Sequence, residues 1–297
     1  MKTSHTARLT FVSMSAALAI GLAACGSMTR TATGPVLSPE RIAQIVASPD
    51  RSAADKTNDR RRKPEAMLAF IGIRPGITAL DISAAGGYTT ELLARAIGPG
   101  GMVYGQSQPR DPSRAAPVPA AAEGQSHPAA ASAMPAPPPP AGAPRPSAVA
   151  LAERQENLKR TGMAAANIVA VARPFDDPVP PELAGQQRLD LATLMFNYHD
   201  LGFMGVDRAR MNRAVFAALK PGGLYVIADH AGRPGTGISE SGTLHRIEEA
   251  FLRNEVEAAG FKLVAEGSFL RNPSDPRDQN TPNPPQPKDE FVLKFVK

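Results

Sequence analysis

Several ionisable side chains of this sequence directly follow short apolar segments, which is where chemistry at a sheet edge would be placed. Asn197, His199 and Asp200 follow one such segment, and Asp229 and His230 follow another. Histidine has an ordinary pKa close to neutrality, so it can move a proton while a neighbouring carboxylate orients its ring. The sequence therefore offers His199 as a candidate base oriented by Asp200, with His230 as the second candidate. For each histidine, a structural hydrogen-bonding role is the alternative.

A turn of small residues is the second candidate site. Asp81 lies in the short apolar segment 77–82, and Ser83, Ala85 and Gly87 alternate in the turn that follows. Small residues allow a backbone to approach a ligand closely. Asp81 is placed to anchor this turn, a role that it can fill whether or not a ligand binds.

Polar groups also follow two further apolar segments. Gln106 and Ser107 come after one of them, and Asp176 and Asp177 come after the other. Carboxamide, hydroxyl and carboxylate oxygens all accept hydrogen bonds from ligand hydroxyl or amino groups. Polar groups thus recur at one end of segments that are otherwise apolar, which is the strongest argument from the residues for a binding site.

The elements that must position these groups alternate along the chain. Expected strands cover 77–82, 102–105, 168–171, 189–196, 224–228, 261–266 and 290–296, and expected helices cover 39–46, 63–72, 89–97, 147–161, 206–219 and 243–259. This alternation predicts an α/β fold with a mostly parallel seven-stranded sheet and helices on both faces. No helix separates the last two strands, so one of them is expected to be antiparallel. Ligands bind at the carboxyl ends of strands in such sheets, which predicts one crevice lined by the polar groups above.

The N-terminus has the pattern of an export signal. Lys2 and Arg8 precede an apolar stretch, 9–22, that is too short to span a membrane. The following residues, 22–26, resemble the bacterial lipobox, which implies that Cys25 becomes the lipidated first residue of the mature protein. Cys25 is the only cysteine, so it has no disulfide partner within the chain.

The sequence divides into three expected parts. Residues 1–24 are the expected signal peptide, 25–37 a polar tether and 38–297 one domain. Twelve of the 30 prolines lie in 109–146, a Pro/Ala-rich stretch with few large apolar residues. Such a stretch buries too little surface to offset the entropy of ordering it, so it is expected to be a disordered insertion. A proline-rich ligand for a partner protein is the alternative reading of the insertion.

Composition narrows the possible partners. Hydrophobic residues make up 42% of the 297 residues, which is enough for one sizeable core. The formal charge is +5 and the basic residues are spread along the chain, the tightest run being 60–63. We interpret that run as a solvated stretch, and we expect no nucleic-acid partner and no stable protein partner. The expected partners are a small-molecule substrate and, through Cys25, a membrane surface.

Several segments resemble class I S-adenosylmethionine-dependent methyltransferases. Residues 80–94 resemble the first motif of that family, and 219–223 resemble the turn ahead of its fifth strand; more narrowly, 196–201, 228–230, 242–246 and 270–273 resemble a group of exported bacterial predicted methyltransferases. The resemblance covers 38–297 apart from the insertion. It implies a Rossmann-like, doubly wound domain that uses S-adenosylmethionine to methylate a small molecule or an envelope component.

The resemblance also implies roles for individual residues. Cofactor contacts fall on Asp81, Ser83, Ala85, Gly87, Gln106, Asp176 and Asn197. The catalytic candidates are those given by the strand ends, His199, Asp200 and His230, and no metal ligand is expected. The chain departs from the family pattern, since Ser83 and Ala85 replace glycines and Gln106 or Ser107 replaces the acidic residue after the second strand. Pro174 stands where an acidic adenine contact often lies. Gly26 after the cysteine implies anchoring on the periplasmic side of the outer membrane.

Two other functions fit the same residues. The first is a non-catalytic periplasmic binding lipoprotein that retains the methyltransferase fold, which the replaced glycines and the export signal favour. The second is a metal-dependent hydrolase, because two neighbouring His–Asp pairs and a further histidine offer nitrogen and oxygen ligands. The residues of that second alternative are His199, Asp200, Asp229, His230 and His245.

Overall fold

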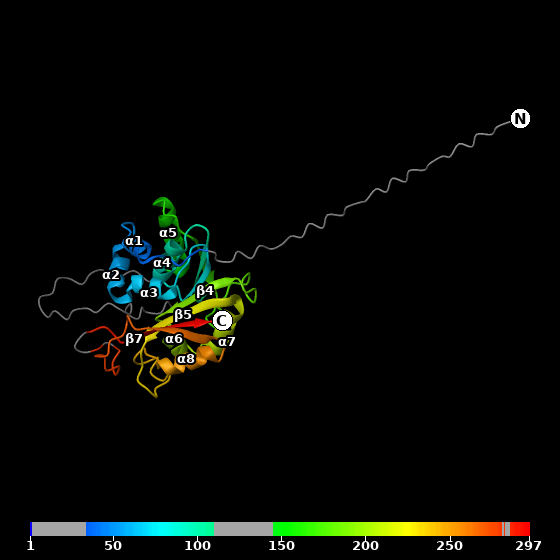
Figure 1. Cartoon of the computed structure of the whole chain (residues 1–297). Coiled ribbons are helices and arrows are strands. Elements are labelled where there is room, and N and C mark those ends of the chain that lie inside the picture. Colours follow the sequence, from blue (N-terminus) through cyan, green and yellow to red (C-terminus); the bar gives the residue numbers. More distant parts are fainter. Residues whose placement is uncertain (2–33, 110–144, 281, 283–285) are drawn as a thin grey trace. The chain divides into compact units, whose positions relative to one another are not determined.

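The computed structural model describes residues 1, 34–109, 145–280, 282 and 286–297 (Figure 1). The chain divides into two units, Met1–Thr31 and Ala32–Lys297, and the fold described here is that of the second. The expected signal peptide, Cys25, most of the tether and all but the ends of the insertion lie outside the described residues. The expectations for those segments remain predictions.

Seven strands form one sheet in the order β3-β2-β1-β4-β5-β7-β6. Their bounds are β1 Thr78–Ile82, β2 Met102–Ser107, β3 Asn167–Ala172, β4 Leu189–Met195, β5 Leu219–His230, β6 Lys262–Gly267 and β7 Glu290–Val296. Strands β1 to β5 pair in parallel, whereas β7 pairs antiparallel with both β5 and β6. The expected α/β class, the seven strands and the antiparallel closing strand are therefore confirmed.

Eight helices connect or precede the described strands. Their bounds are α1 Pro39–Val46, α2 Ala53–Arg62, α3 Pro64–Ile71, α4 Tyr88–Ile97, α5 Ser147–Arg160, α6 Tyr198–Phe203, α7 Arg208–Ala218 and α8 Glu249–Glu257. The start of α1 is as expected, because the Ser38 side chain accepts a hydrogen bond from the backbone N–H of Arg41. The expected helix 243–259 begins later than predicted, at Glu249. One reason is that His245 has a φ of 51°, a left-handed conformation that an α-helix cannot include.

Helix α2 was not predicted, and its composition explains why. Its sequence AADKTNDRRR has no apolar stripe, and Asp55 is its one buried residue. The helix therefore lacks the apolar periodicity on which sequence prediction depends. The basic run that we expected to be a solvated stretch is the last turn of α2 together with Lys63, which has a φ of 43° and ends the helix.

The sheet is covered on both faces by helices with separate apolar cores. Helices α1, α3 and α4 pack on one face, and α6, α7 and α8 pack on the other (Figure 1). Strand β1 lies in the middle of the sheet and is almost wholly buried, in agreement with its apolar sequence. Within the described residues, none of the helices has both the length and the apolar character needed to cross a membrane.

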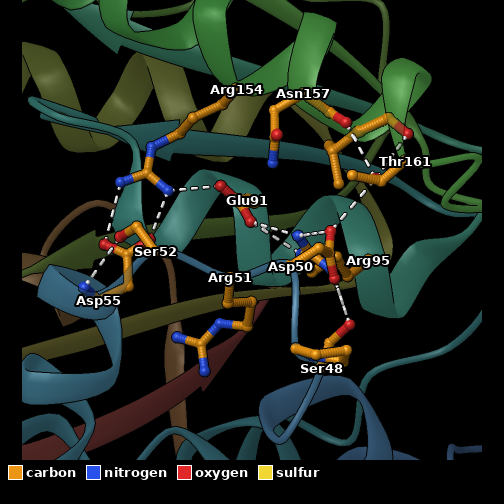
Figure 2. A network of polar contacts seen from close by, with 12 residues as sticks. Ser48, Asp50, Arg51, Ser52, Asp55, Glu91, Arg95, Arg154, Asn157 and Thr161 are labelled. Atoms are coloured by element: carbon orange, nitrogen blue, oxygen red, sulfur yellow. Dashed lines mark hydrogen bonds and ion pairs between the residues drawn. The ribbon is translucent and has the colours of Figure 1, made fainter.

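Ion pairs fasten α2 to the rest of the domain in place of apolar contacts (Figure 2). Arg154 of α5 lies 2.7 Å from the carboxylate of Asp55 in α2 and 2.5 Å from that of Glu91 in α4. Glu91 also pairs with Arg95, at 2.7 Å, and Arg95 pairs with Asp50, which precedes α2, at 2.8 Å. The Arg95 side chain is 1% exposed, so this network is a buried structural element joining three helices.

Candidate functional site

The turn between β1 and α4 keeps a left-handed backbone at three alternate positions. The φ angles are 60° at Ser83, 46° at Ala85 and 81° at Gly87. These are the positions of the glycine triplet in the family that the sequence resembles. A left-handed conformation costs a non-glycine residue roughly 1 kcal/mol of conformational free energy, which a few favourable contacts with neighbouring residues can offset. Replacing two glycines has therefore not removed the left-handed conformation at those positions.

Contacts from β2 and α5 hold this turn. The backbone N–H of Ser83 donates to Oε1 of Gln106 at 2.9 Å, and Nε of Arg154 donates to the carbonyl of Gly86 at 2.5 Å. A Cβ atom added to Gly87 would lie 2.7 Å from side-chain carbons of both Leu151 and Arg154. Helix α5 therefore packs directly against the third position of the turn, which only glycine fits.

We expect Gly87→Ala to lower the free energy of unfolding by about 2–3 kcal/mol, because it adds overpacking to a strained φ. The matched change Ala85→Gly, at an exposed left-handed residue, should alter the same quantity by less than about 1 kcal/mol. Urea unfolding of both variants measures the difference. Equal effects would show that helix α5 does not pack on the turn as described.

Asp81 lies beneath the turn and takes the anchoring role expected of it. Its carboxylate accepts hydrogen bonds from Oγ1 of Thr90 at 2.6 Å and from Oγ1 of Thr193 at 2.8 Å. Burial raises the pKa of Asp81 to about 6, against the opposing effect of the two threonine hydrogen bonds. The side chain ties α4 to β4 and is 2% exposed, so it does not reach a ligand from the surface.

Gln106 is also used within the protein, which corrects its expected role. Its Oε1 accepts from Ser83, its Nε2 donates to the carbonyl of Arg173 at 2.6 Å, and the residue is fully buried. Its carbonyl oxygen therefore does not face a ribose hydroxyl in this structure. Ser107, the alternative considered at this strand end, is half-buried.

From Ser83 a line of polar contacts crosses to the neighbouring strand. Oγ of Ser83 donates to Oδ1 of Asn197 at 2.8 Å, and Nδ2 of Asn197 donates to Oδ2 of Asp200 at 2.9 Å. Asn197 directly precedes α6, and Asp200 lies in the first turn of that helix. The structure thus brings together Gln106, Ser83, Asn197 and Asp200 from the ends of β2, β1 and β4, as the sheet-edge argument predicted.

The line continues through two histidines. Nε2 of His199 lies 3.1 Å from Oδ1 of Asp200, and Nδ1 of His199 lies 2.6 Å from Oδ1 of Asp229 at the end of β5. Nδ1 of His245 lies 2.9 Å from the same Asp200 oxygen. His199 and Asp229 are fully buried, whereas the Asp200 and His245 side chains are each 24% exposed. Asp200 and His245 therefore form the end of this line that solvent reaches.

The protonation state of His199 does not fit its predicted role as a base. Burial lowers the pKa of His199, but the charge of Asp229 and the hydrogen bonds and charge of Asp200 outweigh this and raise it from 6.5 to about 10. The ring is therefore protonated at neutral pH, and an imidazolium has no lone pair with which to accept a proton. The carboxylate that orients the His199 ring also differs from the predicted one, because Asp229 holds Nδ1 and Asp200 lies at Nε2.

Two other predicted residues lie away from the accessible end. His230 is 1% exposed, and its Nδ1 lies 3.0 Å from Oε1 of Glu290. Burial keeps its ring from an acceptor in solvent, so the structure does not favour it as the second base. Asp176 pairs with Arg210 of α7 at 3.0 Å and does not join the line of polar contacts.

Asp229 and His245 are more central to the site than the sequence predicted. Asp229 directly precedes His230, and parallel pairing of β4 with β5 brings their ends together, so a signal for its contact with His199 was present in the strand pattern. His245 comes from a left-handed loop position without periodicity, so no pattern in the sequence singled it out. The ligand atoms of His199, Asp200 and His245 lie within 4.8 Å of one another, a set of donors that can hold a divalent metal ion.

The fold is a Rossmann-like α/β fold of the kind found in class I S-adenosylmethionine-dependent methyltransferases. Its structural neighbours include an arsenic(III) S-adenosylmethionine methyltransferase from Chlamydomonas reinhardtii, which is 12% identical, covers 87% of this chain and 73% of its own, and has a TM-score of 0.50. A second neighbour is an S-adenosylmethionine-dependent methyltransferase from Aquifex aeolicus, with 14% identity, coverage of 88% and 100%, and a TM-score of 0.48.

At this level of identity the likeness concerns the fold alone. No protein-family model matches the chain, and a comparison with curated proteins finds no match. What the site does must therefore be argued from its own residues.

Proposed function

We propose that this protein is an S-adenosylmethionine-dependent methyltransferase that acts on a small-molecule or envelope acceptor. The observation that carries the proposal is the turn 83–87, which is left-handed at the three positions of the family's glycine triplet. This turn lies at the carboxyl end of β1 and is joined by hydrogen bonds to the ends of β2 and β4. In an open α/β sheet that edge is where a nucleotide-like ligand binds.

The residues present fit such a cofactor at the turn. Ala85 and Gly86 are exposed, so their backbone can approach the amino-acid part of the molecule. Ser107 is half-buried along the same edge and offers a hydroxyl group. The half-buried Ser83 and Asn197 are hydrogen-bonded to each other, and their side-chain oxygens can accept a further hydrogen bond. When bound, S-adenosylmethionine supplies an electrophilic methyl group on a sulfonium.

Asp200 and His245 are the residues that we place against the acceptor. Three donors, from Asn197, His199 and His245, fix the Asp200 carboxylate, so its position is set before an acceptor arrives. Methyl transfer is an in-line displacement, which depends on such positioning more than on a strong base. His199 and Asp229 act on the acceptor only through Asp200.

We also propose, from the lipobox resemblance of 22–26, that Cys25 is lipidated and holds the protein on the periplasmic side of the outer membrane. Lipid on one residue attaches a protein to a membrane surface without a spanning helix. The proposal rests on the sequence alone, since Cys25 lies outside the described residues.

Calorimetric titration of the purified chain with S-adenosylmethionine and S-adenosylhomocysteine tests the cofactor. We expect binding of both, with much weaker binding of adenosine, which lacks the amino-acid part. Ala85→Leu should weaken both by at least about tenfold because its side chain would occupy the approach to the turn. Ala54→Leu, at an exposed position of α2, is the matched control. No heat with either compound would favour the non-catalytic binding protein instead.

A further inference from the structure

A cavity lies beside the turn, between α3, α4 and the end of β4. It is partly open to solvent, and the empty space in it, including this open part, is about 360 Å³. The lining residues are mostly apolar: Pro64, Met67, Leu68, Ile71, Leu92, Leu93, Met195 and Phe196, with Tyr88, Thr89 and Arg62. Tyr88 directly follows Gly87, so the cavity adjoins the turn that we assign to the cofactor.

Arg62 is the only charged side chain among these lining residues. It is half-buried at the end of α2, and within the part of the chain that the structure describes it makes no hydrogen bond or ion pair. Its guanidinium lies 4.7 Å from the ring centre of Phe196 and 5.4 Å from that of Tyr88. Aromatic faces attract a cation but do not supply acceptors for its N–H groups.

The charge of Arg62 is thus left without a matched anion. Burial, together with the neighbouring charge of Arg61, lowers the pKa of Arg62 to about 10, so the side chain still carries its charge at neutral pH. Bringing a guanidinium out of water costs free energy unless an anion and hydrogen bonds offset it. A carboxylate, which Arg can bind through two parallel hydrogen bonds, would supply both.

The lining also indicates what the rest of such a ligand must be. Among the described residues that line it there is no Asp or Glu to pair with an ammonium group, and a zwitterion would bring its positive charge toward Arg62. The remaining surface is that of aliphatic, thioether and aromatic side chains, which favour an apolar body. The amino-acid part of S-adenosylmethionine, which carries an ammonium and a sulfonium, fits this lining poorly.

We propose that this cavity binds a small apolar carboxylic acid through Arg62. Neither Asp200 nor His245 lines this cavity, so the acid is a further ligand, separate from the acceptor that we place against those two residues. The aromatic rings of Phe196 and Tyr88 hold the Arg62 guanidinium at the cavity. The ligand carboxylate then accepts the hydrogen bonds that the guanidinium would otherwise donate to water. The apolar chain lies along α3 and α4.

Titration of the full-length protein with hexanoate, hexanol and hexylammonium tests the charge selectivity. We expect hexanoate to bind at least about tenfold more tightly than hexanol, and hexylammonium not to bind. Arg62→Met should remove the preference for hexanoate, whereas Arg62→Lys should retain part of it. Arg60→Met, two positions away at an exposed residue of α2, should bind all three compounds as the wild type does. Equal binding of hexanoate by the wild type and by Arg62→Met would overturn the proposal.

A parallel titration with S-adenosylhomocysteine separates this proposal from the proposed function. Arg62→Met should bind S-adenosylhomocysteine as the wild type does. If it lost that compound and kept hexanoate, Arg62 would belong to the cofactor site and the proposal would be wrong. If no form of the protein bound S-adenosylhomocysteine but hexanoate binding still depended on Arg62, the methyltransferase assignment would fail and the carboxylate site would stand.

Discussion

Replacing Arg95 by methionine is expected to lower the free energy of unfolding by about 3–5 kcal/mol, the range for removing one partner of a buried ion pair. The Arg95 guanidinium lies 2.8 Å from Asp50 and 2.7 Å from Glu91, and the Glu91 side chain is 6% exposed. Methionine fills a similar volume but leaves both carboxylates without this cation. Urea unfolding followed by circular dichroism measures the loss.

The control for this prediction is another arginine that pairs with a glutamate one helical turn away. Arg253 lies 3.2 Å from Glu257, but their side chains are 45% and 34% exposed. Because exposed pairs contribute little, Arg253→Met should change the free energy of unfolding by less than about 0.5 kcal/mol. A similar small effect for Arg95→Met would mean that the Arg95 ion pairs of Figure 2 do not hold α4 to the segment that precedes α2.

The second large effect is a loss of stability at alkaline pH that originates at His199. Its pKa in the folded protein is about 10, against an ordinary value of 6.5, so between these values the folded state holds a proton that the unfolded state has lost. The stabilisation is complete below about pH 6.5 and disappears as the pH rises through 10. Over that interval the free energy of unfolding should fall by about 3–5 kcal/mol.

Unfolding curves measured at several pH values from 6 to 10 test this, and the slope against pH is the quantity of interest. His199→Gln should remove most of the decline, and Asp229→Asn should reduce it, because Asp200 still faces the ring. Glu156→Gln, whose carboxylate is on the surface and pairs with Lys159, should leave the slope unchanged. A wild-type protein with constant stability over this range would contradict the buried imidazolium.

The sheet was predictable from sequence because its strands are short apolar runs between turns. Six of the seven strands occur close to their expected bounds, whereas β5 begins five residues before the expected strand 224–228 and ends two residues after it. The absence of a helix before β7 correctly predicted antiparallel pairing. Helix α2 could not be predicted, since its position depends on ion pairs with α5 and not on an apolar face. The predicted start of α8 was wrong for a local reason, which is the left-handed backbone at His245.

The site was predictable as a region but not in its internal pairing. Parallel strands placed Ser83, Asn197 and His199 at one edge, as expected from the fold alone. Which carboxylate would hold His199 depended on side-chain directions that a sequence does not specify, and Asp229 took the place given to Asp200. Gln106 was expected to face a ligand, yet its amide is used to join the β1 turn to the end of β3.

The last strand of the chain has an interior place in the sheet, with β5 on one side and β6 on the other. Strand β6 has no other partner within the described sheet, so it cannot pair until β7 has arrived. During synthesis, β7 is the last strand to emerge from the ribosome. A chain cut short before Glu290 should therefore keep β6 unpaired and prone to association with other chains.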